Sequence, residues 1–231
     1  MFRNSLGVMA LLVFSHGAAQ AGRPLVTDDA GVLERRQCEL EGGLTRERAD
    51  ELRSRSESLQ LGCGVGGDTQ LALATSHART GGDQKRERMR GVALLVKTRL
   101  WQQDDAALSL SASLDGLRAA GKGWRLDSSR VNLIHSRPGP AAMTWHINLG
   151  HARNEHERQA STTWGVALEH PGLGAVAPMA ELFGDDRSAP WWNLGLRWTL
   201  LADRAWLDTS YGRQIVGSRP TAWTMGFKLV F

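Results

Sequence analysis

Two histidines and a serine in the middle of the chain come nearest to a catalytic or metal-binding set. His151 and His156 lie in the stretch HARNEH, and Ser161 follows five residues later. A serine beside a histidine can act as a nucleophile. The alternation of the flanking residues, however, places His151 with Leu149 on one face of a strand and Ser161 with Gly165 on the other. No cysteine or carboxylate at ligand spacing completes a metal site. The sequence therefore predicts no catalytic residue, metal or cofactor.

Two cysteines are the next pair whose spacing has chemical meaning. If the first hairpin turns between Asp50 and Glu51, Cys38 lies directly opposite Cys63. Opposed cysteines on antiparallel strands have a Cα separation that permits a disulfide, which an oxidising compartment would allow to form. We expect a Cys38–Cys63 bond, with two unpaired thiols as the alternative.

Charged side chains on the polar faces of predicted strands form a third group. In a barrel lumen, opposed acids and bases can form a selectivity element or a closed plug. They can also simply neutralise one another, and Glu181, Arg197 and Asp208 fall on successive strands where such pairing is possible. The candidate pore-lining residues are Lys97, Arg99, Asp115, His146, Glu169, Glu181, Arg197, Asp208 and Lys228.

Basic residues also gather in a predicted loop between Thr80 and Arg90. Guanidinium groups bind phosphate in bidentate fashion, so an outer-surface cluster would meet the phosphates of lipopolysaccharide. An ordinary solvated loop is the alternative. The candidate contacts are Lys85, Arg86, Arg88 and Arg90.

Strands must position all these residues, because apolar and polar residues alternate along almost the whole chain. In the last strand Trp223, Phe227 and Phe231 share one face, and Thr224 and Lys228 share the other. Short links alternate with longer ones, notably 80–90 and 119–127. The sequence predicts an all-β, closed antiparallel transmembrane barrel with both termini periplasmic. Its twelve strands are expected at 35–48, 52–65, 68–79, 91–102, 105–118, 128–136, 142–153, 158–169, 175–184, 190–201, 204–214 and 219–231.

The N-terminus differs from this pattern. Residues 1–21 have a basic start, a nine-residue apolar run and a small-x-small end, which is typical of a signal peptide. Residues 22–34 lack alternation and are predicted to enter the barrel from the periplasm and narrow it, and residues 35–231 form the barrel. Export of the chain argues against a nucleic-acid partner, although the formal net charge is +4.

Two terminal motifs resemble known outer-membrane proteins. The ending GFKLVF resembles the C-terminal strand that the barrel-assembly machinery recognises, which implies that machinery as a partner. The stretch RPLVTDDA at 23–30, with AELFG at 180–184 and LDTSYG at 207–212, is similar to a barrel family named for the MetA pathway of phenol degradation. That resemblance implies an outer-membrane transporter for small hydrophobic molecules.

These observations favour a channel in the bacterial outer membrane for passive passage of small hydrophobic or aromatic solutes. The first alternative is a non-conducting structural or adhesion barrel with a charge-filled lumen, and the second is a lipid-modifying enzyme. The sequence itself leaves the solute and the oligomeric state open.

Overall fold

The structure is a computed structural model that describes residues 24–82, 86–172, 174–217 and 219–231. The predicted signal peptide lies outside these residues. The helical content of the described part is one 3-10 turn, η1 (Pro140–Ala142). No helix among the described residues has the length and apolar character needed to cross a membrane.

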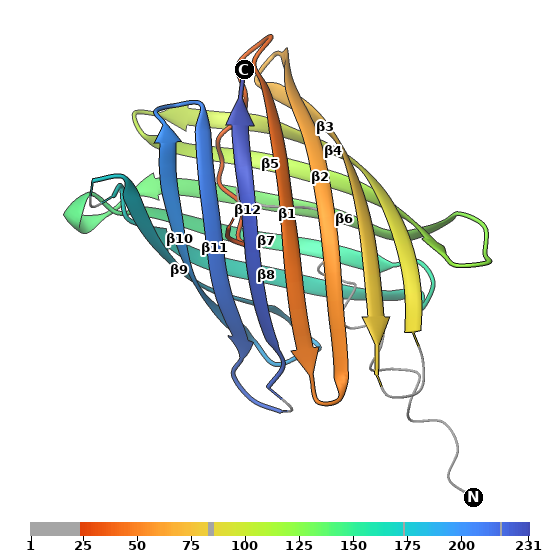
Figure 1. Cartoon of the computed structure of the whole chain (residues 1–231). Helices are drawn as coiled ribbons and strands as arrows, with labels where there is room; N and C mark the ends of the chain where they lie inside the picture. The colour runs from red at the N-terminus through yellow and green to blue at the C-terminus, as the bar shows by residue number, and fades with distance from the viewer. Residues whose placement is uncertain (1–23, 83–85, 173, 218) are drawn as a thin grey trace, which may run out of the picture.

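Twelve antiparallel strands close into a barrel, with every strand paired to its sequence neighbours and β12 paired to β1 (Figure 1). This confirms the predicted fold class and strand number. The strands are β1 (Cys38–Ala49), β2 (Leu52–Gly66), β3 (Thr69–Gly81), β4 (Arg86–Gln103), β5 (Ala106–Ala119), β6 (Arg125–Pro138), β7 (Thr144–Asn154), β8 (Gln159–Glu169), β9 (Val176–Asp185), β10 (Trp191–Leu201), β11 (Ala205–Gln214) and β12 (Thr221–Val230).

The outer face of the barrel carries the large apolar side chains. Leu73, Leu94 and Leu149 are 53%, 63% and 58% exposed. Between them along the strands lie inward residues that are small or polar, such as Ala74 and Asn148, both buried. An apolar band outside and a polar interior are the reverse of a soluble barrel, and they are the arrangement of a transmembrane one.

The two ends of the barrel are distinguished by the residues that they hold. We call the end that holds Cys38 and Phe231 the C-terminal rim, and the end that holds the Asp50–Glu51 turn the distal rim. Two-residue turns place Asp50 and Asp104 at a positive φ of 50°, a conformation that aspartate tolerates better than most residues.

The predicted long loops are shorter than expected. The links at 82–85 and 120–124 replace the expected loops at 80–90 and 119–127, because β3, β4, β5 and β6 all extend toward the distal rim. The assignment of Arg86, Arg88 and Arg90 to a loop was therefore wrong, since they belong to β4. Both faces of this end of β4 carry polar residues, so the contrast between apolar and polar positions vanishes there. Lys85 lies outside the described residues.

The first hairpin has the predicted register. Cys38 lies opposite Cys63, and the two form a disulfide on the outward face at the C-terminal rim. Beside it, the main-chain amides of Cys38 and Phe231 donate to one another's carbonyls at 2.8 and 2.9 Å, which closes the barrel seam.

Candidate functional site

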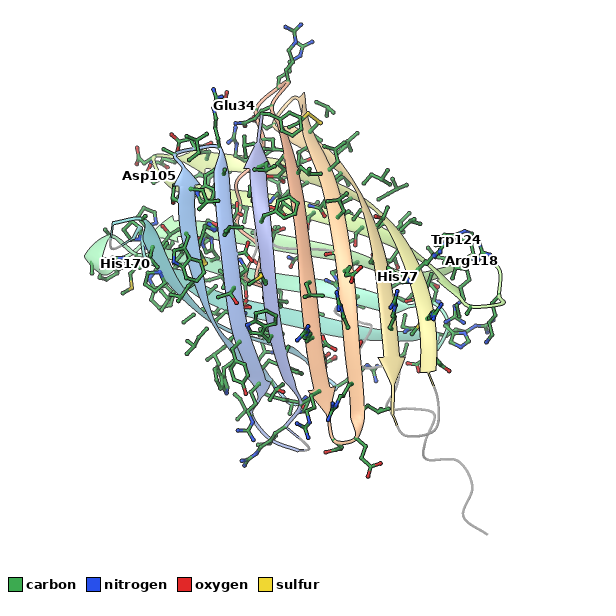
Figure 2. The ribbon with its side chains drawn as sticks, viewed as in Figure 1. Glu34, His77, Asp105, Arg118, Trp124 and His170 are labelled. Atoms are coloured by element: carbon green, nitrogen blue, oxygen red, sulfur yellow. A yellow bond between two sulfur atoms is a disulfide. The ribbon has the colours of Figure 1, made fainter. Side chains whose placement is uncertain are left out.

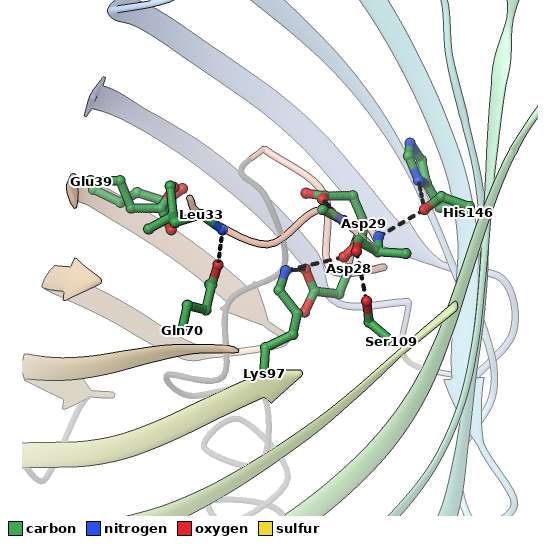
Figure 3. Close-up of polar contacts among 12 residues, drawn as sticks. Asp28, Asp29, Leu33, Glu39, Gln70, Lys97, Ser109 and His146 are labelled. Carbon is green, nitrogen blue, oxygen red and sulfur yellow. Dashed lines mark hydrogen bonds and ion pairs between the residues drawn. The ribbon is translucent and has the colours of Figure 1, made fainter. Parts of the chain in front are cut away.

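Residues 24–34, which we call the lumen segment, lie inside the barrel before the chain turns into β1 (Figure 1). They form neither helix nor strand, so their main-chain groups need partners from the wall. The Ala30 amide donates to Ser136 Oγ at 2.8 Å, and Ser109 Oγ donates to the Ala30 carbonyl at 2.6 Å. Farther along, the Leu33 amide donates to Gln70 Oε1 at 2.9 Å (Figure 3). Strands β3, β5 and β6 thus each supply a partner.

Glu181 on β9 makes the densest contact with the segment. Its carboxylate accepts the Val26 amide at 2.8 and 3.0 Å and the Thr27 amide at 2.7 Å. Asn193 on β10 donates to the same carboxylate at 2.8 Å and lies 3.4 Å from the Pro24 carbonyl. Three donors thus converge on one side chain, so Glu181 anchors the beginning of the segment.

Lys97 on β4 anchors the middle of the segment. Its ammonium lies 3.2 Å from Asp28 Oδ1 and donates to the Asp29 carbonyl at 3.1 Å, as Figure 3 shows. Burial raises the pKa of Asp29, but the positive charges of Lys97, Lys228 and His146 and the Gly31 amide outweigh it and hold that pKa well below its usual value. The ionised side chain of Asp29 is therefore stabilised by the basic groups of the wall.

Glycines in the wall leave room for the segment. A Cβ atom on Gly165 of β8 would lie 2.5 Å from Thr27 Oγ1, and one on Gly195 of β10 would lie 2.9 Å from Pro24 Cγ. At the C-terminal rim, a Cβ on Gly64 would lie 2.0 Å from the Glu34 carbonyl oxygen. The wall and the segment are shaped to one another.

Three of the predicted pore-lining residues form one network on β7, β8 and β10. Arg197 Nη1 lies 2.9 Å from Glu169 Oε1, and His146 Nε2 lies 3.7 Å from Glu169 Oε2. His146 Nδ1 is 2.8 Å from Ser136 Oγ, the hydroxyl that accepts the Ala30 amide. This network therefore reaches the lumen segment through one serine.

The other predicted residues are spread along the lumen. Lys228 pairs with Glu39 and Glu41 across the β1–β12 seam. Asp208 is buried opposite Arg197 in the β10–β11 register, and Asp115 is buried and accepts a bond from Ser128 Oγ at 3.0 Å. Arg99 pairs with Asp68 at the turn after β2, so it lies at the C-terminal rim.

The lumen segment lies between two cavities. The first, of about 250 Å³, is strongly charged and is lined in part by Asp28, Asp29, Glu39, Lys97 and Lys228. The second, of about 300 Å³, is lined by the beginning of the segment and by the walls toward the distal rim. Both cavities are lined by Val26, Arg130 and Asn132, which mark the place where they meet.

The second cavity has a more apolar wall. Phe183 and Trp191 both line it, and their rings stack with centroids 6.3 Å apart. Leu25 and Leu52 add further apolar surface, and Glu47 adds a carboxyl group. A chamber with apolar surface and a few polar groups suits a small ligand with an apolar body.

Sequence reasoning missed most of the polar partners of the segment, including Gln70, Ser109, Ser136 and Asn193. All four fall on the polar face by parity, which is the one signal that would have found them. Their uncharged side chains gave no reason to select them from the many other serines and amides.

The enzyme candidates do not come together. His151 lies opposite Thr162, whereas Ser161 lies opposite Ala152, so the two side chains point to opposite faces of the sheet. Ser161 lines the second cavity, and His151 is exposed on the outer face. Among the described residues, no three histidine, cysteine or acidic side chains are grouped so that they could hold a metal ion.

Comparison with known proteins gives a family and a fold. Residues 9–231 match the model of a family described as "Uncharacterised conserved protein UCP029691". No curated protein matches the chain. Among solved structures, the COG4313 outer membrane channel from Pseudomonas putida F1 is similar at a TM-score of 0.67 and 9% identity, over 88% of this chain and 98% of that one.

Two porins are also similar in structure. The KdgM porin, solved in complex with disordered oligogalacturonate, gives a TM-score of 0.60 at 11% identity, over 83% of this chain and 99% of that one. The NanC porin gives 0.55 at 8% identity, over 82% and 98%. At these identities the similarity establishes the outer-membrane barrel fold.

Proposed function

The chain belongs to the family of uncharacterised conserved proteins UCP029691, and we propose that it is an outer-membrane channel whose lumen segment controls passage. The observation that carries this proposal is the position of residues 24–34 between two cavities of one closed barrel. A barrel that served only as a structural element would have no need of cavities on both sides of an irregular segment. The channel fold of the neighbouring structures supports the same role.

The contacts that bind the lumen segment to the barrel wall are local and polar, which suits a segment that can move. Its partners are single side chains on separate strands, such as Gln70, Lys97 and Glu181, rather than a continuous strand ladder. A small apolar cluster adds to these contacts, since Leu25 packs against Ala167 and Met179. Segments bound by a few contacts open at lower free energy than a strand within a sheet.

We propose small solutes with an apolar or aromatic part as the cargo. The stacked Phe183 and Trp191 rings on the wall of the second cavity support this class. The resemblance to the phenol-degradation barrels supports it as well. The charged first cavity, with Lys97 and Lys228 facing acidic groups, favours solutes of low net charge over strongly anionic ones.

Single-channel recording in planar bilayers tests this function. The intact mature chain should conduct weakly or in brief openings, and a chain lacking residues 22–34 should conduct more and for longer. Liposome swelling with aromatic and aliphatic solutes of matched size then tests the cargo. Absence of conductance from both chains would favour the alternative, a non-conducting barrel filled by its own charges. Equal conductance from both chains would contradict the role of the lumen segment.

The C-terminal strand is the part of the chain for which we propose a protein partner. Phe231 is 70% exposed on the outward face, beside the seam that β1 and β12 close. We propose that the barrel-assembly machinery reads this strand during insertion, and that both termini face the periplasm. The candidate pair for an enzymatic role is not brought together, because His151 and Ser161 lie on opposite faces.

A further inference from the structure

A row of arginines crosses the outward face of four neighbouring strands near the distal rim. The strand register places Arg46 opposite Arg55, Arg55 opposite Arg79, and Arg79 opposite Arg88. All four side chains are exposed. Residues beside Arg46, Arg55 and Arg79 in sequence, namely Thr45, Ser54 and Thr80, line the second cavity inside the barrel, so these arginines point away from the lumen. Arg88 shares its face of β4 with the exposed Val92 and Leu94.

A second row lies one step nearer the middle of the barrel. His77 faces Arg90, and Arg90 faces Arg118 on β5. Figure 2 shows His77 and Arg118 on the same side of the barrel. We call the outward arginines of β1–β5 the arginine belt; its members are Arg46, Arg48, Arg53, Arg55, Arg79, Arg88, Arg90 and Arg118.

The belt carries far more positive than negative charge. Like charges directly opposite one another on antiparallel strands destabilise a sheet. Glu57 lies on the same face and pairs with Arg55 at 2.8 Å. Eight exposed guanidinium groups give this face a positive potential, which attracts anions from outside the chain.

The position of the belt indicates where such anions would lie. Leu59, Leu73 and Val92 lie on the same outward faces, toward the middle of the barrel, and are 47%, 53% and 39% exposed. They belong to the apolar band that contacts lipid tails. On each strand the arginines lie beyond this band, toward the distal rim, which is the level of lipid headgroups.

We propose that the arginine belt binds the phosphate groups of lipopolysaccharide in the leaflet around the distal rim. Guanidinium is the cationic group that matches phosphate in bidentate geometry. Four guanidiniums side by side in one row fit a headgroup with several phosphates better than one with a single phosphate. The solute of the channel is a poor candidate for this site, because the belt lies on the opposite face of the strands from the lumen. This inference does not depend on conduction.

Binding to purified, refolded protein in detergent tests the proposal, with lipopolysaccharide, phosphatase-treated lipopolysaccharide and phosphatidylglycerol as the probes. The belt variant combines Arg55→Gln, Arg79→Gln and Arg88→Gln. The control combines Arg153→Gln, Arg187→Gln and Arg213→Gln, which removes the same charge from exposed positions outside the belt. The shift between unboiled and boiled samples on a detergent gel verifies that every variant is folded.

We expect the belt variant to bind lipopolysaccharide about tenfold more weakly or worse, since each charge-assisted bond contributes substantially to affinity. The control should bind as the wild type does, and phosphatase treatment should weaken wild-type binding. Without lipid, the belt variant should unfold at the same or a higher temperature, because its like charges are gone. Unchanged binding by the belt variant, an equal loss in the control, or equally tight binding of phosphatidylglycerol would each overturn the proposal.

Discussion

The carboxylate of Glu181 holds the main-chain amide of Thr27 at 2.7 Å, although 154 residues separate them in the sequence. The same carboxylate also accepts the Val26 amide, so one side chain on β9 fixes the start of the lumen segment. Two neighbouring main-chain amides of the segment therefore point at one carboxyl group of the wall. These bonds are made by side-chain oxygens of Glu181, so they are not part of the main-chain ladder of β9.

The first prediction concerns this bond. Glu181→Ala should release the beginning of the segment and increase channel openings severalfold in bilayer recordings, since each lost hydrogen bond contributes roughly 0.5–1.5 kcal/mol. Glu57→Ala removes an acid from the outward face and is the matched control. If both variants open as rarely as the wild type, Glu181 does not restrain the segment.

The second prediction uses the close approach of the segment to β8. An ideal Cβ on Gly165 lies 3.3 Å from Thr27 Cβ, close to the Cβ separation of a disulfide. In a chain that also carries Cys38→Ser and Cys63→Ser, Thr27→Cys with Gly165→Cys should form a bond that locks the segment. Conductance should then rise when a reductant is added. A locked channel that conducts as freely as the reduced one would argue against movement of the segment.

The third prediction concerns the exit of the segment at the C-terminal rim. Gly64→Ala would place a Cβ 2.0 Å from the Glu34 carbonyl oxygen, and overpacking of this kind costs about 1–3 kcal/mol. Gly62→Ala, on the same face of β2, meets its neighbours at an ordinary 3.4 Å and is the control. Urea unfolding in detergent should show a loss for Gly64→Ala alone. Equal stability of the two variants would show that the backbone there adjusts freely.

Period-two alternation was enough to predict twelve strands and the barrel, because one face of most strands contacts lipid and the other does not. It also gave the Cys38–Cys63 pairing, since a two-residue turn at Asp50 and Glu51 fixes the register of the whole hairpin. It failed at the start of β4, where Arg88 and Glu87 are both polar although they face opposite sides.

The path of the lumen segment was beyond such reasoning. Its contacts depend on where Gln70, Ser109 and Asn193 lie around the closed barrel, and that placement follows from the strand register rather than from any local pattern. The prediction that residues 22–34 narrow the barrel therefore stays a prediction, and it needs the conductance measurements.

The fourth prediction concerns the terminal aromatic residue. Deleting Phe231 removes one exposed side chain and the last hydrogen bonds of the seam, so refolded protein should lose little stability. If the assembly machinery reads this residue, the amount inserted in cells should fall severalfold. Removing Trp223, by Trp223→Ala on the same face of β12, serves as the control for lost apolar surface. Normal insertion of the truncated chain would show that Phe231 is ordinary packing.

The last prediction concerns pH. The neighbouring positive charges hold the pKa of Asp29 below the ordinary value of 3.8, so its ionised form stabilises the docked segment. For a group whose pKa is lowered by docking, this contribution is complete above the ordinary pKa and is lost as the pH falls below it. Acidification below about pH 4 should therefore loosen the segment and increase openings in bilayer recordings.

The variant Asp29→Asn isolates this contribution from that of other acids that gain protons on acidification. It lacks the charge at every pH, so the segment should already be looser at neutral pH. Its openings should then rise less on acidification than those of the wild type. A wild-type channel that closes in acid, or a variant with the same pH profile as the wild type, would show that the charge of Asp29 does not hold the segment against Lys97 and Lys228.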